Sequence, residues 1–362
     1  MNPSDEELPD VVDLLSGAVA AGASDVHLCA DLPPSMRVRG GIQRCCDRVI
    51  DRKECREMIL GILTDSQRAR LERDLELDFG LQVSGTGRFR GNAHYSRGAL
   101  EATFRHIPAG IPELSDLGHR STIEGLCDLD KGLVLVTGMT GSGKTTTLAS
   151  MIRRISESRS GVIVTIEDPI EFYLPSSRSI IKQRELGTDT KSFDEALRHV
   201  LRQDPDVIMV GEMRDPETVR AALTAAETGH LVLATLHTND APGALDRIVD
   251  NFPGDEQEKI IGQLANALRG VLAQRLVPSE DGLNRVMVSE LLTNNSAVSA
   301  CIRDRRFEQI VGLMEIGRKD GMHTFDDVLE ELYLAYRISK EEAVAGSRDP
   351  SRLEVLRRVP RK

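Results

Sequence analysis

The 362-residue sequence has no tryptophan and few other aromatic residues, with 8 Phe and 4 Tyr. Proteins that bind single-stranded nucleic acid stack bases on aromatic side chains, so this scarcity argues against that function. The charge balance argues the same way, because 46 Lys+Arg against 57 Asp+Glu leave a formal net charge of -11. Binding to a phosphate backbone needs an excess of basic residues. We therefore expect no nucleic-acid partner.

Two further absences concern the membrane and metal ions. No apolar run approaches the roughly 20 residues that a membrane-spanning helix needs. The N-terminus, M-N-P-S-D-E-E-L-P-D, is acidic and polar, unlike a secretory signal. The 6 cysteines include no C-x-x-C pair, which argues against a structural zinc site and favours reduced thiols. We expect a cytoplasmic protein that reaches a membrane only through a partner.

A glycine-rich motif at residues 138–145, G-M-T-G-S-G-K-T, fits the pattern G-x-x-x-x-G-K-[ST] at every fixed position. The apolar run 133–137 before it is typical of a buried parallel strand. After it, Leu148, Met151, Ile152 and Ile155 recur at helical spacing. Strand, loop and helix together predict a phosphate-binding loop rather than an ordinary glycine turn.

The motif assigns roles to individual residues. Lys144 is expected to reach the β- and γ-phosphates of ATP, and Thr145 to hold Mg²⁺. Backbone N–H groups of the loop and the first turn of the helix would contact the phosphates. The predicted nucleotide-binding residues are Gly138, Met139, Thr140, Gly141, Ser142, Gly143, Lys144, Thr145 and Thr146.

The chain divides into an N-terminal α+β domain at 1–107, a linker at 108–119 and an α/β domain at 120–362. Pro and Gly cluster at 108–112, between two patterned regions. The first domain is expected to contain helices at 10–21, 52–63 and 64–73, and strands at 25–29, 36–38, 75–83, 87–95 and 99–107. In the second, apolar runs at 133–137, 162–166, 207–210 and 231–235 alternate with helices and predict a doubly wound parallel sheet. From residue 255 onward we expect helices, with one strand near 285–291.

Two acidic segments follow strands of the second domain. D-V-I-M-V-G-E at 206–212 is an apolar strand followed by an acidic residue, and Glu212 would support Mg²⁺. T-I-E-D-P-I-E-F at 165–172 crowds Glu167, Asp168 and Glu171 after another strand. Glu167 is the predicted base that orients and deprotonates water. Alone, either segment also fits a solvated surface turn.

Histidines flank the strand at 231–235. His237 follows it and would face the same crevice, where a neutral imidazole contacts the γ-phosphate. His230 precedes it, so a structural role or a role toward a neighbouring subunit is equally consistent.

In the N-terminal domain, G-R-F-R-G-N-A-H-Y-S-R-G and F-R-H-I-P carry several arginines. These are surface residues or phosphate contacts across an interface.

The motif set resembles the secretion ATPase superfamily (GspE/PilT family) of type II secretion and type IV pilus systems. The resemblance covers nearly the whole chain. It rests on A-G-A-S-D-V-H-L and L-P-P-S-M-R-V-R-G within 21–40, on R-F-R-G-N and the phosphate loop, and on T-I-E-D-P-I-E-F. It also rests on R-Q-D-P-D-V-I-M-V-G-E-M-R-D at 202–215 and A-A-E-T-G-H-L-V-L-A-T-L-H-T-N-D-A at 225–241.

The resemblance implies a PAS-like N-terminal domain followed by a RecA-like ATPase domain with a helical C-terminal extension, assembled as a homohexamer. It implies that Glu167 is the catalytic glutamate, Glu212 the Walker B glutamate, and His230 and His237 the His-box histidines. Arg90, Arg97 and Arg105 match the family's N-terminal arginines that reach toward the phosphates. The implied partners are an inner-membrane pilus platform protein and a paralogous motor subunit.

Within the superfamily the sequence is most similar to the pilus-retraction ATPases. It has no paired-cysteine zinc loop, and A-C-I-R-D-R at 300–305 lies where retraction ATPases carry an A-I-R-containing motif needed for retraction. Cys301 and Arg305 depart from that motif, which leaves open a primary motor or an accessory paralogue. A pilus-assembly or secretion ATPase, a RecA-like nucleic-acid translocase and a non-catalytic ATP-binding subunit are the alternatives.

Overall fold

A computed structural model describes residues 9–38, 40–107, 110–356 and 358. The acidic start at 1–8 and the linker residues 108–109 lie outside the described residues. The chain folds into two compact units, the first comprising Met1–Gly110 with Pro169–Tyr173 and the second Ile111–Asp168 with Leu174–Lys362. The boundary therefore falls after Gly110, and residues 169–172 of the acidic segment 165–172 belong to the first unit.

The first unit is built on a six-stranded antiparallel sheet in the order β3-β2-β1-β6-β5-β4. Asp51 and Thr64 begin α2 and α3 with reciprocal capping boxes, which satisfy backbone donors that the helices leave open. The elements are α1 (Val11–Ala20), β1 (Ala23–Leu28), β2 (Ser35–Val38), β3 (Gly41–Arg44), α2 (Arg52–Gly61), α3 (Asp65–Asp74), β4 (Glu76–Val83), β5 (Gly87–Ser96) and β6 (Ala99–Ile107).

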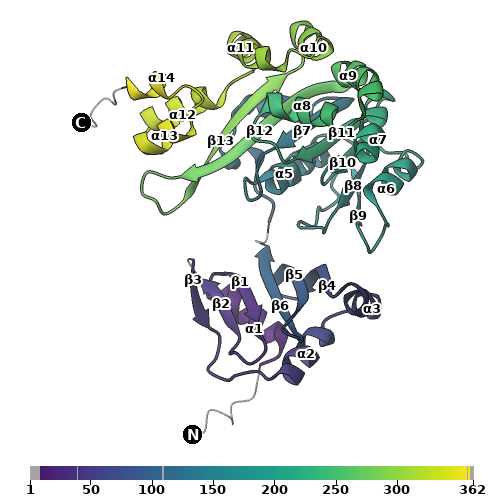
Figure 1. Cartoon of the computed structure of the whole chain (residues 1–362), viewed down its shortest axis with the longest axis vertical. Coiled ribbons are helices and arrows are strands. Elements are labelled where there is room, and N and C mark those ends of the chain that lie inside the picture. The colour runs from purple at the N-terminus through teal and green to yellow at the C-terminus, as the bar shows by residue number, and fades with distance from the viewer. Residues whose placement is uncertain (1–8, 39, 108–109, 357, 359–362) are drawn as a thin grey trace. The chain divides into compact units, whose positions relative to one another are not determined.

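The second unit contains a seven-stranded sheet in the order β13-β12-β7-β11-β10-β8-β9 (Figure 1). The pairs β12–β7, β7–β11, β11–β10, β10–β8 and β8–β9 are parallel, and only β12–β13 is antiparallel. Its strands are β7 (Gly132–Thr137), β8 (Val162–Glu167), β9 (Ile180–Glu185), β10 (Val207–Val210), β11 (Leu231–Leu236), β12 (Leu268–Pro278) and β13 (Arg285–Thr293).

The helices of this unit connect and cover the strands. They are η1 (Leu114–Leu117), η2 (Ser121–Ile123), α4 (Glu124–Cys127), α5 (Lys144–Ser158), α6 (Phe193–Val200), α7 (Pro216–Glu227), α8 (Ala241–Asp250), α9 (Gly254–Ala267), α10 (Ser296–Arg303), η3 (Phe307–Gln309), α11 (Ile310–Ile316), η4 (Gly317–Asp320), α12 (Phe325–Leu334), α13 (Lys340–Gly346) and α14 (Pro350–Glu354). No described helix combines the length and apolarity that a bilayer crossing requires.

The four apolar runs predicted to be parallel strands are strands β7, β8, β10 and β11. Every residue of β7, β10 and β11 is buried, as expected where helices cover both faces of a parallel sheet. Helix α5 buries the stripe predicted from its spacing, Leu148, Met151, Ile152 and Ile155. The mixed α/β fold predicted from the sequence is confirmed.

The prediction of an almost wholly helical segment after residue 255 is wrong. Residues 268–278 form β12, which pairs with β7 on one side and with β13 on the other. Gly270 and Gln274 interrupt its apolar character, so the run lacks the signature of a buried strand. Two short strands, β3 and β9, were also not predicted. Their burial patterns show no regular alternation, as is common at a sheet edge.

Helices α12, α13 and α14 pack on the β12–β13 hairpin (Figure 1). Phe325 and Leu329 of α12 and Leu353 of α14 share one apolar cluster with Ala273 of β12 and Val288 of β13. This cluster joins the helical extension to β13 and to β12, the strand that lies beside β7. The extension is therefore part of the same compact unit as the glycine loop.

Candidate functional site: a phosphate-binding loop and three strand ends

Four neighbouring parallel strands end at one edge of the second sheet. Residue Thr137 of β7 lies opposite Leu236 of β11, and Val210 of β10 lies between Ala234 and Ile166. The residues that follow these strands are the glycine loop, His237, Glu212 and Glu167. The carboxyl end of an open parallel sheet is where ligands bind, so the sheet collects the predicted chemistry in one place.

Two glycines explain the shape of the loop. Gly138 has φ 150°, and a Cβ there would lie 2.3 Å from the carbonyl oxygen of Gln274 and 2.5 Å from Ser142 Oγ. Gly143 has φ 91° and stands at the N-cap of α5 without a side-chain cap. Glycine is therefore required at both positions, since it alone fits the close approach and adopts these dihedrals readily. The first turn of α5 is left open toward an anion.

Polar groups of the loop suit a phosphate. The Lys144 ammonium donates to the carbonyl oxygens of Gly138 at 2.7 Å and Met139 at 3.2 Å, which holds it within the loop. Ser142 Oγ is buried and has no hydrogen-bond partner among the described residues. A hydroxyl can donate to a phosphate oxygen, so this buried atom fits a nucleotide. Gln274 Nε2 donates to the Ser142 carbonyl at 2.8 Å and anchors the loop to β12.

Glu167 is held in place at the end of β8. Its side chain is 5% exposed, and its Oε1 accepts hydrogen bonds from Thr165 Oγ1 at 2.7 Å and Gln183 Nε2 at 3.0 Å. Thr165 is on the same strand and Gln183 on the neighbouring β9. A carboxylate fixed in this way at the ligand-binding edge has the position that a general base needs. Of the other two carboxylates in this segment, Asp168 is exposed and Glu171 groups with the first unit.

Glu212 and His237 meet at the ends of β10 and β11. His237 Nε2 lies 3.2 Å from Glu212 Oε1, and Arg214 Nη2 lies 2.6 Å from Glu212 Oε2. Burial raises the pKa of Glu212, but the hydrogen bond from Arg214 and the proximity of His237 outweigh it. The net pKa of Glu212 therefore lies below its ordinary value, and the carboxylate is ionised at neutral pH.

The donor set fits Mg²⁺ bound together with a phosphate. No group of three or more His, Cys, Asp or Glu side chains able to hold a metal occurs among the described residues. A site made entirely of such side chains is therefore not found in that part of the chain. Mg²⁺ prefers hard oxygen ligands and commonly uses one or two carboxylates together with substrate phosphates. The ionised Glu212 and the Thr145 hydroxyl at the start of α5 are ligands of that type.

His230 lies at the other end of β11. Its Nδ1 is 3.0 Å from the Ala225 carbonyl oxygen, and its own carbonyl accepts from Gly132 N. At about 3.3 Å per residue, the length of β11 separates His230 from His237 by roughly 20 Å. The chain itself therefore does not bring His230 to the edge with Glu167, Glu212 and His237.

The three predicted N-terminal arginines lie in the first unit. Arg90 is 3.9 Å from Glu171, and Arg105 Nε donates to Asp25 at 2.9 Å. Burial raises the pKa of Asp25, but hydrogen bonds from Ser24 and Arg105 lower it below its ordinary value. Arg97 occupies a two-residue hairpin turn with φ 51° and is exposed.

The sequence did not identify the residues that contact the groups of the candidate site. Gln183 and Gln274 lie on β9 and β12, two strands that were not predicted. Thr137 Oγ1 lies 2.6 Å from the Thr238 hydroxyl. It also lies 2.8 Å from the Thr238 carbonyl oxygen and accepts from the Thr238 N–H at 3.0 Å. The sequence does show Thr137 directly before the loop and Thr238 directly after His237. Only the pairing of β7 with β11 shows that these two side chains meet.

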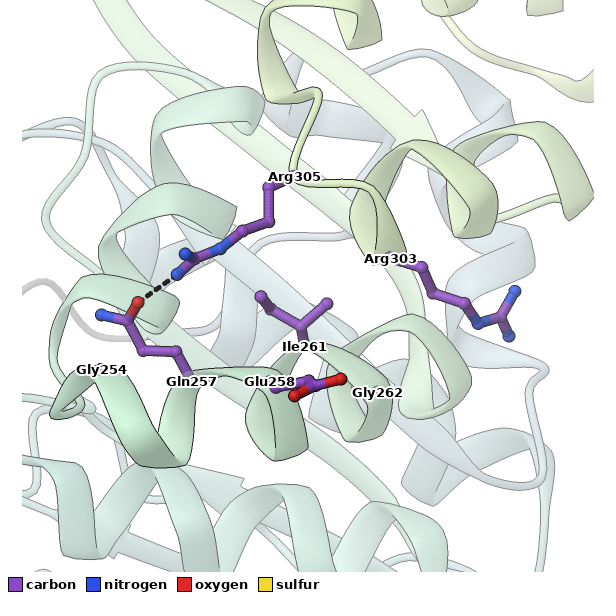
Figure 2. Close-up of a pocket in the computed structure, with 7 residues that line it drawn as sticks. All are labelled: Gly254, Gln257, Glu258, Ile261, Gly262, Arg303 and Arg305. Atoms are coloured by element: carbon purple, nitrogen blue, oxygen red, sulfur yellow. Dashed lines mark hydrogen bonds between the residues drawn. The ribbon is translucent and has the colours of Figure 1, made fainter.

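A cavity of about 370 Å³ lies elsewhere in the second unit, between α9 and the end of α10. Figure 2 shows that Arg305 extends toward Gln257 of α9 and donates a hydrogen bond to its side chain. Arg303 points away from Gln257. Arg303 donates to Asn266 at 2.9 Å. Both arginines belong to the segment 300–305 that was singled out in the sequence. The remaining lining residues are Gly254, Glu258, Ile261 and Gly262.

The strand, glycine loop and helix, with an ionised glutamate and a buried glutamate on neighbouring strand ends, define a P-loop nucleoside triphosphatase. The family model for "Type II/IV secretion system protein" matches residues 107–340. The chain belongs to this family of secretion ATPases.

Three relatives place it more closely. It is 42% identical over 94% of its length to "Type IV pilus retractation ATPase PilT" of Pseudomonas aeruginosa, covering 99% of that protein. It is 39% identical over 95% of its length to "Type IV pilus ATPase PilU" of the same organism, covering 90% of it. A crystal structure of "the Pilus Retraction Motor PilT and Bound ADP" matches with a TM-score of 0.89 and 44% identity, covering 97% of this chain and 100% of the other.

Proposed function

We propose that this protein is the ATP-driven motor that retracts a type IV pilus. The observation that carries the proposal is the likeness to a pilus-retraction ATPase along almost the whole of both chains. The likeness includes both units, not the nucleotide-binding unit alone. The site supplies the chemistry of ATP hydrolysis, which is the energy source of such a motor.

The proposed hydrolysis rests on positioning and electrostatics. Lys144 and Mg²⁺, the latter held by Thr145 and Glu212, balance the charge on the phosphates. Glu167 accepts a proton from the attacking water, and His237, beside Glu212, contacts the γ-phosphate. His230 lies at the opposite end of β11, so its role is toward a neighbouring subunit or structural.

The proposed assembly is a homohexamer on the cytoplasmic face of the inner membrane, joined to a pilus platform protein and a paralogous motor. In it Arg90, Arg97 and Arg105 reach the nucleotide across an interface, and the linker 108–119 is the hinge. The exposure of Arg97 and Arg105 supports a role at an interface. Arg97 holds a left-handed backbone that disfavours most residues, and the Arg105 side chain is 71% exposed despite its ion pair.

The test begins with purified protein. Wild type should hydrolyse ATP with no stimulation by DNA, and Lys144→Ala should abolish turnover while its circular dichroism spectrum is unchanged. Stimulation by DNA would favour the nucleic-acid translocase, and near-wild-type turnover in Lys144→Ala would sink the assignment of the site. A wild type that binds ATP without turnover would favour a non-catalytic subunit.

The cellular test separates retraction from pilus assembly or secretion. Deletion of the gene should leave cells with excess pili and without twitching motility, and only the wild-type gene should restore motility. A strain that loses its pili would identify an assembly ATPase instead. Retraction that is weakened but not lost would identify an accessory paralogue, consistent with the departures at Cys301 and Arg305.

A further inference from the structure

A buried carboxylate in the second unit lies outside the nucleotide site. Glu290 of β13 is 0% exposed. Its Oε1 accepts from the backbone N–H of Ala241 at 2.8 Å and from Arg348 Nη2 at 3.0 Å, and its Oε2 accepts from Arg348 Nη1 at 2.6 Å. Arg348 therefore binds it in the two-pronged geometry that orients both groups.

Arg348 joins three parts of the unit. Its backbone N–H donates to Asp326 of α12 at 2.9 Å, which ties it to the C-terminal helices. Its guanidinium also lies 3.1 Å from Asp240, the residue that caps α8. We name Arg348, Glu290 and Asp240 the arginine clamp. The clamp connects the C-terminal helices, β13 and the start of α8.

The clamp continues to the phosphate loop through two threonines. Asp240 Oδ1 accepts from Gly243 N at 2.8 Å, and its carbonyl accepts from Thr238 Oγ1 at 3.3 Å. Thr238 N donates to Thr137 Oγ1 at 3.0 Å, and the two hydroxyls are 2.6 Å apart. Thr137 directly precedes Gly138, the first residue of the loop. Three hydrogen-bonded steps therefore separate Arg348 from the loop.

The presence of a buried ion pair is weak evidence that the pair stabilises the fold. Removing charges from water costs several kcal/mol per ion, and well-packed apolar residues of similar volume often serve the fold as well or better. The same C-terminal helices contain a second arginine, Arg352, whose acidic partners both lie in α12. Arg352 binds Glu330 at 2.7 Å and Asp327 at 3.0 Å, both within α12. Arg348 differs because its acidic partners lie on β13 and before α8.

We propose that Arg348 is a positioning residue for the nucleotide site, acting through Glu290, Asp240, Thr238 and Thr137 to hold the phosphate loop and the strand end that bears His237. The C-terminal helices are then part of the nucleotide-binding machinery rather than a cover for the β12–β13 hairpin. The proposal rests on nucleotide binding at residues 138–145 and not on pilus retraction.

The test compares two arginines of similar exposure, since the side chains of Arg348 and Arg352 are 28% and 32% exposed. Each is replaced by methionine in the full-length protein, and the affinity for fluorescent mant-ADP and the KM and kcat for ATP are measured. Arg348→Met should weaken mant-ADP binding and raise KM by at least about fivefold, the lower end of typical coupling between sites. Arg352→Met should change both less than twofold, although it removes two ion pairs.

A double-mutant cycle tests the path. The effects of Arg348→Met and Thr238→Val on mant-ADP affinity should be less than additive, because both break one connection, whereas Arg352→Met and Thr238→Val should be additive. Asp240→Asn keeps a good helix cap and should weaken binding in the same direction even if Arg348→Met folds poorly.

Unchanged affinity in Asp240→Asn, or additive effects in the first cycle, would overturn the proposal. An equal loss in Arg352→Met would also overturn it, because the effect would then be one of general stability. The proposed function fails differently. A wild type that binds mant-ADP but does not turn over ATP removes the motor and leaves the positioning role testable by affinity alone.

Discussion

Acid should destabilise the second unit through two histidines, one that contacts α5 and one that contacts β13. His119 Nε2 lies 3.2 Å from Thr147 Oγ1 of α5, and His323 Nε2 lies 3.3 Å from Ser289 Oγ. The Nδ1 atoms of both rings are out of contact with solvent. Burial lowers the pKa of each histidine to about 4, and the two rings also lie close enough for His323 to lower the pKa of His119.

The direction of the effect follows from proton binding. The unfolded chain takes up these protons near pH 6.5, the ordinary histidine value, and the folded protein only near pH 4. Between these values the unfolded state binds more protons, so stability is fully present above pH 6.5 and falls as the pH drops toward 4. Between pH 7 and pH 5 each histidine should lower the free energy of unfolding by about 2 kcal/mol.

Urea unfolding followed by far-ultraviolet circular dichroism is the assay, since the chain has no tryptophan to report on folding. The double variant His119→Gln/His323→Gln keeps a polar atom near each Nε2 but does not titrate. Its loss of stability between pH 7 and pH 5 should be smaller than that of wild type by about 4 kcal/mol if the two sites act independently. His199→Gln, at an exposed position of α6, is the matched control. A double variant as acid-sensitive as wild type would refute the reasoning.

Two further predictions concern the site itself. Glu167→Gln should retain ADP affinity, because Thr165 and Gln183 can still donate to its carbonyl oxygen, while steady-state ATP turnover falls about 10²- to 10⁴-fold; normal turnover would place the base elsewhere. Gly138→Ala should lose mant-ADP binding, because the new Cβ would lie 2.3 Å from the Gln274 carbonyl oxygen. Gly312→Ala, on α11 with no atom within 4 Å of the new Cβ, should bind normally; equal binding by both variants would contradict the close-approach argument.

Local pattern was sufficient for the elements that a single physical signal marks. The four apolar runs of the second sheet and the stripe on α5 were predicted, because complete burial leaves no place for polar residues. Strands β9 and β12 were not predicted, because Gln183 and Gln274 interrupt them with polar side chains. Both side chains contact the candidate site, because Gln183 donates to Glu167 and Gln274 donates to the loop carbonyl of Ser142. The strand signal is therefore weak in β9 and β12, two strands that contact the candidate site.

The residues of the candidate site also fall into two groups, those that the sequence predicted and those that only the structure revealed. Gly138, Lys144, Thr145, Glu167, Glu212 and His237 were named from motif and strand order, since parallel strands bring their carboxyl ends to one edge. Their immediate partners were not named. Thr238 meets Thr137 and Gln183 meets Glu167 across neighbouring strands, and no spacing in the sequence predicts such contacts. Arg214 pairs with Glu212 from two residues further along the chain. Residues 169–173, which include Glu171, group with the first unit, and the local sequence pattern did not indicate this.

The sequence by itself determined the class of chemistry. A glycine loop that only glycine can form, a lysine, and acidic residues after apolar strands are local features, and local sterics and charge are enough to recognise them. Only the tertiary structure decided how these groups are held. It placed β12 beside β7 and put His230 and His237 at opposite ends of one strand. It also joined Arg348 to Glu290 across 58 residues of sequence. Such contacts depend on the whole sheet and its packed helices, because burial brings together side chains that are distant in the chain.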